Sequence, residues 1–312
     1  MVCSDGRPQS ATKNRNIYGE KCSSFAVRKH HVWVFQVQSF CDYTRIRLLR
    51  DEYDMCLLLV AHNCCEGYKL IIAANRDEYH ERPTSPAAIW SDNDRIIGGR
   101  DERSSGTWLA VDRTGRFATI TNVPLGNKKN KNPRSRGLIV NDFLKGKRSA
   151  RHYVESLSNA GNSYDGFNTL VHDSTELVWY SNNTTDSKPE VLPKGIYTLS
   201  NATLKTRWPK TERLRNSFQI VFDNYPNAIT EPLFDVLRDK GHASTREDSE
   251  QEVLISDEKP YSSIFINGDV YGTRCSTVIT IDEDNRMAFN ERRYDAKGKV
   301  CGQSKLNFKI EH

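Results

Sequence analysis

Residues 73–83 read Ala-Ala-Asn-Arg-Asp-Glu-Tyr-His-Glu-Arg-Pro and follow an apolar, β-branched run that is typical of a buried strand. The stretch places one amide, one guanidinium and two carboxylates in four consecutive residues. Because successive side chains of a strand point to opposite faces, Asn75 and Asp77 would share one face, and Arg76 and Glu78 the other. The neighbouring carboxylates can orient the planar guanidinium. We therefore expect this strand to end in a polar site.

A thiol lies just upstream, where Met55-Cys56 opens the preceding apolar strand. Acyl transfer needs a nucleophile, a base and amide donors that hold the oxyanion, and polar residues at the ends of predicted strands could supply them. If Met55 is the first residue and is removed, the α-amine of Cys56 could be the base. The alternative is a cysteine that simply packs as a small apolar side chain. The candidate catalytic residues are Cys56, Arg76, Asp77, Asn122, Asn201 and Arg274.

The composition is that of a globular protein, with 312 residues, 37% hydrophobic and 27% charged. A formal net charge of +5 is weak support for nucleic-acid binding, because the basic residues are scattered among 40 acidic ones. Loop 126–137 is the most basic stretch and could bind an anion, but no aromatic platform accompanies it. We expect no nucleic-acid partner, and no apolar run long enough for a transmembrane segment is present.

The cysteines are too few for a disulfide scaffold, and no CxxC pair suggests structural zinc. No signal peptide is visible, so we expect a reduced, intracellular protein. Residues 1–54 are irregular apart from a strand-like alternation at 31–37, and acidic residues spoil a mitochondrial presequence pattern. We predict a poorly ordered N-terminal extension, 1–54, followed by one domain, 55–312.

The order of predicted elements is strands, then two helix pairs, then strands. It indicates an α+β fold of two sheets covered by helices, and no Rossmann or P-loop motif argues otherwise. The predicted strands include 56–60, 69–74, 106–111, 117–122, 167–171, 177–180, 197–201, 276–281 and 287–292. The predicted helices are 138–144, 151–157, 211–222 and 230–237. Segment 246–259 is acidic and polar and is predicted to be a loop.

Several motifs closely resemble the NRDE family, whose eukaryotic members are the transport and Golgi organisation 2 proteins. They are 73–78 with Arg82-Pro83, Gly-Thr-Trp-Leu at 106–109, Asp-Gly-Phe-Asn at 165–168, Leu-Ser-Asn-Ala at 199–202 and Tyr-Gly-Thr-Arg at 271–274. The resemblance covers residues 55 to about 291. It implies a four-layer αββα sandwich resembling N-terminal-nucleophile hydrolases.

The resemblance also implies a role in Golgi organisation and protein secretion, and in haem trafficking, with haem as cargo. It implies a cytoplasmic protein, also mitochondrial or Golgi-associated, with haem exporters or trafficking proteins as partners. Thiolate and imidazole suit haem iron. The candidate haem ligands are Cys64, Cys65, His62 and His80.

The alternative function is an amidase that acts on a small amide or acyl-amino acid. On the hydrolase template, Cys56 matches the nucleophile, Arg76 and Asp77 match the pair that activates it, and Asn122, Asn201 and Arg274 match the polar pocket. This chain departs from the family pattern at two places. Cys56 is internal, and Ser105 stands where the family usually has glycine.

Overall fold

The computed structural model describes residues 26–29, 32–35, 56–124, 132–183, 187–241 and 263–311. The chain divides into two units, Met1–Glu52 and Tyr53–His312. In the first unit, β1 (Ala26–Lys29) and β2 (Val32–Phe35) form an antiparallel pair, so the alternation at 31–37 does mark a strand. The rest of the predicted extension, residues 126–131 of loop 126–137 and all of segment 246–259 lie outside the described residues.

The second unit contains two antiparallel sheets. The seven-stranded sheet has the order β11-β10-β9-β8-β7-β6-β5. Its strands are β5 (Thr84–Trp90), β6 (Asn93–Asp101), β7 (Leu109–Asp112), β8 (Phe117–Asn122), β9 (Phe167–His172), β10 (Leu177–Ser181) and β11 (Glu190–Leu192). Consecutive strands are neighbours throughout, which makes this sheet a simple meander.

The six-stranded sheet has the order β12-β3-β4-β13-β14-β15. Its strands are β3 (Cys56–Cys65), β4 (Tyr68–Tyr79), β12 (Gly195–Leu199), β13 (Tyr271–Asp282), β14 (Arg286–Tyr294) and β15 (Val300–Lys309). The β3–β4 hairpin therefore lies inside the sheet, between β12 and β13. Its position brings the first and last thirds of the domain together around residues 73–83.

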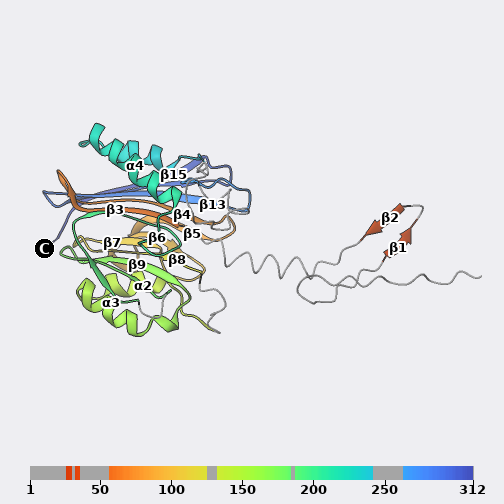
Figure 1. Cartoon of the computed structure of the whole chain (residues 1–312), viewed down its shortest axis with the longest axis horizontal. Coiled ribbons are helices and arrows are strands. Elements are labelled where there is room, and N and C mark those ends of the chain that lie inside the picture. Colours follow the sequence, from red (N-terminus) through yellow and green to blue (C-terminus); the bar gives the residue numbers. More distant parts are fainter. Residues whose placement is uncertain are drawn as a thin grey trace, which may run out of the picture. The chain divides into compact units, whose positions relative to one another are not determined.

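Helices cover the outer face of each sheet (Figure 1). Helices α2 (Gly137–Lys145) and α3 (Ala150–Asn159) lie on the seven-stranded sheet, followed by a short 3-10 turn at Gly161–Ser163. Helices α4 (Pro209–Asn224) and α5 (Thr230–Leu237) lie on the six-stranded sheet. Apolar cores fill the space between the sheets and beneath each helix pair. This arrangement confirms the predicted four-layer αββα sandwich of the α+β class.

The strands that the sequence missed include β1, β5, β11 and β15. Strand β5 contains Pro86, which cannot donate to a ladder and lowers the strand signal. Strand β15 is at the edge of its sheet and exposes every second residue, so its apolar content is low. The helices were predicted within a few residues of their ends.

Strand β4 is longer than predicted. The sequence indicated that it ends at residue 74, but it continues through the polar quartet to Tyr79. Asn75, Arg76, Asp77 and Glu78 are all buried, with 1 to 8% of each residue exposed. Buried charges are tolerated only when they are paired or hydrogen-bonded. The partners come from distant segments that the local pattern does not reveal.

Candidate functional site

The helix-facing side of β4 carries Asn75, which holds three segments together. Its Nδ2 group donates to the carbonyl oxygens of Leu237 and Ile264, each at 2.8 Å. Its Oδ1 atom accepts from Ser276 Oγ at 2.6 Å. Asn75 thus ties the end of α5 and the segment before β13 to the six-stranded sheet. This side chain stabilises the fold rather than facing the space between the sheets.

Asp77 lies on the same face and is buried, with 4% of the residue exposed. Thr273 Oγ1 donates to Asp77 Oδ1 at 2.6 Å and accepts from the backbone N–H of Ile266 at 2.9 Å. Burial raises the pKa of Asp77 to about 7, although Thr273, Lys210 and Arg76 favour the ionised form. Alternation along β4 therefore points the Asp77 carboxyl away from the Arg76 side chain, with which the sequence had paired it.

The opposite face of β4 carries an ionic network of four side chains. Arg76 Nη2 lies 3.4 Å from Glu78 and 3.6 Å from Asp101. Arg82 Nε lies 2.5 Å from Asp101 and 3.5 Å from Glu78. The Arg76 guanidinium also lies 4.4 Å from the centre of the Trp108 ring. Two cations and two carboxylates thus alternate, and both arginines are held in place.

Cys56 lies directly opposite Arg76 in the β3–β4 ladder, so the two side chains share the face between the sheets. Both line a pocket of about 290 Å³. The pocket also takes in the Asn122 end of β8 and the segment that leads into α2. The other lining residues are Asp77, Glu78, Arg82, Asp101, Ser104, Gly106, Thr107, Trp108, Ile120, Pro133, Arg134, Ser135, Arg136, Gly137 and Asp165.

Asn201 belongs to a hydrogen-bond network behind this pocket. Its Nδ2 group donates to the Asn122 carbonyl at 3.0 Å, and Ser200 Oγ lies 2.9 Å from the Cys56 carbonyl oxygen. Asn168 Nδ2 donates to Thr121 Oγ1 and to the Ala202 carbonyl. The Leu-Ser-Asn-Ala and Asp-Gly-Phe-Asn motifs therefore meet here, and they fix the first residue of β3 against the end of β8.

Arg274 does not line the pocket. Its Nη1 group donates to the carbonyl oxygens of Tyr79 and Arg82 at 2.8 and 3.1 Å, and so it fixes the turn that follows β4. Burial, with Arg76 nearby, lowers the pKa of Arg274. The structure thus brings Cys56, Arg76 and Asn122 to one pocket, with Asn201 and Arg274 acting on its walls. Their catalytic roles remain predictions.

Two glycines let the mouth of the pocket form. A Cβ atom on Gly106 would lie 2.7 Å from the backbone of Gly137, and one on Gly137 would lie 3.0 Å from Gly106. Arg136 Nη1 donates to the Gly166 carbonyl at 3.1 Å. The sequence pattern did not predict four of the residues that line the pocket: Arg82, Asp101, Trp108 and Arg136. Arg82 and Trp108 lie inside motifs shared with the family, and this could have marked them as site residues.

The four candidate haem ligands do not converge. His62, Cys64 and Cys65 lie at the turn end of β3, whereas His80 follows the far end of β4, with its Nε2 atom 2.8 Å from the Gly268 carbonyl oxygen. Cys64 is exposed and Cys65 is buried. Burial beside Cys64 raises the pKa of the Cys65 thiol to about 12. The described residues contain no group of three or more side chains arranged to hold a metal ion.

His62 packs between the sheets against His172, with ring centres 5.3 Å apart. Both imidazoles are buried, and His172 also stacks on Phe117. Burial lowers the pKa of His62 and lowers that of His172 to about 4. Both histidines are therefore neutral at neutral pH. Because His62 is buried between the sheets, it is poorly placed to reach a ligand at the surface.

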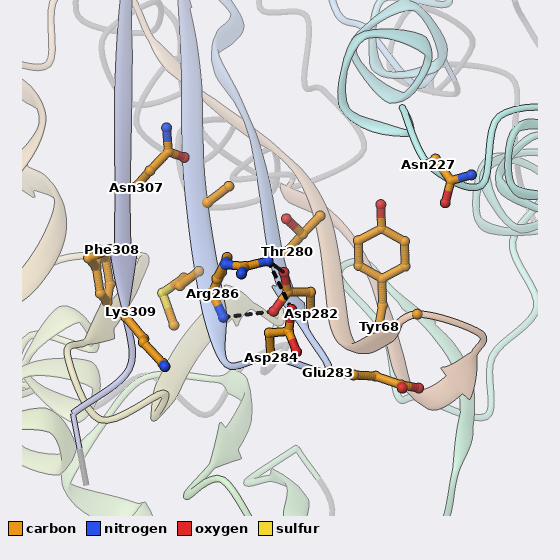
Figure 2. Close-up of a pocket in the computed structure, with 13 residues that line it drawn as sticks. Tyr68, Asn227, Thr280, Asp282, Glu283, Asp284, Arg286, Asn307, Phe308 and Lys309 are labelled. Carbon is orange, nitrogen blue, oxygen red and sulfur yellow. Dashed lines mark hydrogen bonds and ion pairs between the residues drawn. The ribbon is translucent and has the colours of Figure 1, made fainter.

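A groove of about 820 Å³ begins at Gly67 and Tyr68, at the turn between β3 and β4 (Figure 2). Tyr68 and Asn227 stand on one side, and the β13–β14 turn and β15 supply the other. Arg286 pairs with Asp284 at 2.9 Å and lies 3.9 Å from Asp282. The remaining lining residues are Gly67, Thr280, Glu283, Met287, Ala288, Asn307, Phe308 and Lys309. The groove is thus polar, with charges of both signs.

Fold and pocket define a class: layered αββα proteins with a thiol on the first residue of an inner strand. Residues 55–296 match the family described as Transport and Golgi organisation 2. The mouse Transport and Golgi organization 2 homolog is 31% identical over 240 residues, covering 72% of this chain and 87% of the relative. The human homolog is 32% identical over 244 residues, with the same coverage. The chain belongs to the Transport and Golgi organisation 2 family.

Among solved structures, the chain is similar to the Caenorhabditis elegans N-acylethanolamine-hydrolyzing acid amidase ortholog. The TM-score is 0.41 at 12% identity, over 72% of this chain and 92% of that one. No helix in the described part of the chain is long and apolar enough to cross a membrane.

Proposed function

We propose that this member of the Transport and Golgi organisation 2 family handles haem as a transient cargo. The observation that carries the proposal is the exposure of Cys64 at the β3–β4 turn. Thiolate is a suitable haem ligand, and a single exposed ligand permits release as well as capture. Cys65, His62 and His80 are less suitable, because the first two are buried and the third contacts a backbone carbonyl.

A groove whose lining begins at Gly67, three residues after Cys64, supports a cargo site at this end of the domain. Its volume of about 820 Å³ falls within the range of small-molecule sites, whereas the Cys56 pocket of about 290 Å³ lies at the lower limit. Tyr68 supplies aromatic surface, and Lys309 supplies a cation for an anionic group. In this proposal the protein acts in the cytoplasm or mitochondrion, or at the Golgi, and passes haem to exporters or trafficking proteins.

Haem titration of the full chain tests the proposal. We expect a shifted Soret band that is weakened in Cys64→Ser and unchanged in Cys301→Ser. Cys301 is the matched control, because it is also exposed but lies on β15. An equal response of both variants would move the ligand elsewhere, and the absence of any shift with the wild-type chain would refute haem binding.

A second candidate function is hydrolysis of a small amide or acyl-amino acid at Cys56. The observation that favours it is the placement of Cys56 opposite Arg76 in a walled polar pocket. The Cys56 sulfur would attack the carbonyl carbon, its proton would pass to the base and then to the leaving amine, and water would cleave the thioester. In the full chain the Cys56 nitrogen is an amide and cannot accept that proton.

Comparison of the full chain with a form that begins at Cys56 tests this candidate. We expect hydrolysis of acyl-amino acids only in the trimmed form, with complete loss in Cys56→Ala. Residues Tyr53–His312 form a unit of their own, so a form that begins at Cys56 keeps all of that unit except residues 53–55. Equal activity in both forms would refute the α-amine mechanism. Haem binding should be the same in both forms, because ligation needs a side chain and not the amine.

A further inference from the structure

The turn end of β3 contains two adjacent thiols that face each other. The Sγ atoms of Cys64 and Cys65 are 3.9 Å apart. Cys64 is exposed, whereas Cys65 is buried in the core beneath α4 and α5. Cys64 can therefore meet a reagent from solution, whereas Cys65, of which 7% is exposed, is largely shielded from it.

The backbone around this pair is irregular. In the β3–β4 ladder His62 pairs with Leu70 and Cys65 with Tyr68, so Asn63 and Cys64 together oppose the single residue Lys69. Asn63 has a left-handed conformation, with φ of 47°. A bulge leaves its extra residue outside the ladder pairing. Cys64 can therefore shift without breaking the pairs on either side of it.

Among the cysteines in the described part of the chain, this is the pair within reach of bond formation. Cys56 and Cys275 both pair with Arg76 from opposite sides, so their Cα atoms are about 10 Å apart across three strands. Disulfides need Cα atoms within about 7 Å. Cys301 lies on β15, two strands from Cys275 and further from the other three.

We propose that Cys64 and Cys65 form a reversible oxidation site that closes to a vicinal disulfide in response to hydroperoxides. The Cys64 thiolate attacks the terminal peroxide oxygen, the O–O bond breaks, and the product is a sulfenic acid plus water or an alcohol. The Cys65 sulfur then attacks the Cys64 sulfur, the S–O bond breaks, and water leaves with the Cys65 proton. Two thiols are oxidised by two electrons and one peroxide is reduced.

Reversibility follows from the chain geometry. Adjacent Cα atoms are about 3.8 Å apart, which is shorter than the roughly 4.4 to 6.8 Å usual for disulfides, so the closed ring is strained. Strained, exposed disulfides are the ones that dithiols reduce readily. Closing the bond also requires the two sulfurs, now 3.9 Å apart, to approach by about 1.9 Å. That approach draws the Cys65 sulfur out of the core beneath α4 and α5.

The disulfide would change the surface next to it. Tyr68 pairs with Cys65 in the ladder, packs against the same core and lines the 820 Å³ groove. We therefore expect oxidation to lower the midpoint of thermal unfolding and to change the packing of the Tyr68 side chain. The oxidation needs only the two thiols and a peroxide, so it does not depend on haem in the groove.

Mass spectrometry of the full chain after treatment with hydrogen peroxide tests the site. Peptide 51–69 contains Cys56, Cys64 and Cys65 and is released by trypsin. We expect its mass to fall by two hydrogens, with Cys56 still open to alkylation and the other two blocked. Dithiothreitol should restore both thiols. Phenylarsine oxide, which bridges two close thiols, should protect the same pair from alkylation.

Three variants make the test decisive. Cys64→Ser and Cys65→Ser should each abolish the mass loss and the protection by phenylarsine oxide, whereas Cys301→Ser should retain both. A disulfide between Cys56 and either thiol would overturn the proposal. So would oxidation of Cys64 to the sulfinic acid while Cys65 remains reduced in the wild-type chain. Near-ultraviolet circular dichroism of each variant confirms that the fold is retained.

Discussion

At the start of β3, Cys56 lies in a pocket walled by both sheets and opposite a guanidinium with fixed partners, whereas at the end of β3 Cys64 is exposed beside a bulge. The two thiols are separated by eight residues of strand, or about 26 Å. At the first end, side chains from β4, β6 and the β4–β5 turn hold the charges in place. At the second end, the buried groups are neutral imidazoles. The same hairpin thus carries a rigid site and an adaptable one.

The first prediction compares the stability carried by each end. Arg76→Ala leaves the buried carboxylates of Glu78 and Asp101 without one of their two cations, so we expect a loss of about 3–5 kcal/mol. Cys64→Ser changes an exposed thiol and should cost less than about 0.5 kcal/mol. Urea denaturation of both variants measures the difference.

The double variant sharpens this comparison. Sites this far apart with no shared partners should have additive effects, within about 0.5 kcal/mol. A coupling larger than that would show that the two ends communicate through the hairpin. A small effect of Arg76→Ala alone would mean that Arg82 suffices to neutralise both carboxylates.

The second prediction concerns acid. The pKa of His172 falls from 6.5 to about 4 on folding, so the unfolded chain binds the proton more readily. The contribution of His172 to the free energy of unfolding is therefore fully present above pH 6.5 and is lost as the pH falls towards 4. Between pH 7 and pH 5 the expected loss is about 2 kcal/mol. Urea midpoints across this range measure it, and His172→Gln should flatten the dependence.

Asp77, near the pocket, affects the pH dependence of stability in the opposite direction to His172. Its pKa rises from 3.8 to about 7 on folding, so its contribution is present below pH 3.8 and is lost as the pH rises to 7. Acid therefore favours the folded state at this site and opposes it at His172. We expect Asp77→Asn to steepen the loss of stability on acidification. A shallower loss in that variant would contradict the raised pKa.

The sequence predicted the layers because helical and strand periodicities are local properties. It also predicted that Arg76 and Glu78 share one face of β4, which follows from the alternation of a strand. It did not predict that β4 continues through the polar quartet. That extension depends on Asp101, Leu237 and Ile264, which lie far away in the chain. Partners at such separations leave no mark in a local pattern.

The candidate site shows the same division. Cys56, Arg76 and Asn122 were placed at strand ends by pattern, and the structure brings them to one pocket. Arg274 was expected beside them, but a bulge between Thr273 and Cys275 in β13 redirects it to the turn after β4. A one-residue irregularity changes which face a side chain occupies. Sequence periodicity alone does not reveal where such a bulge occurs.

The last and smallest effect compares two strained residues, one at each end. Ser105, at the pocket mouth, has a left-handed conformation with φ of 54°. A left-handed conformation costs an ordinary residue about 1–2 kcal/mol, and the extra freedom of glycine in the unfolded chain offsets part of the gain. We expect Ser105→Gly to stabilise the fold by about 0.5–1 kcal/mol.

Asn63, at the bulge, is the matched position, with φ of 47°. Asparagine tolerates the left-handed region better than serine, so Asn63→Gly should change stability by less than about 0.5 kcal/mol. Thermal melts of the two variants provide the measurement. If Asn63→Gly stabilised the chain as much as Ser105→Gly, the bulge would hold as much strain as the pocket mouth, and the contrast between a rigid end and an adaptable end would fail at the level of the backbone.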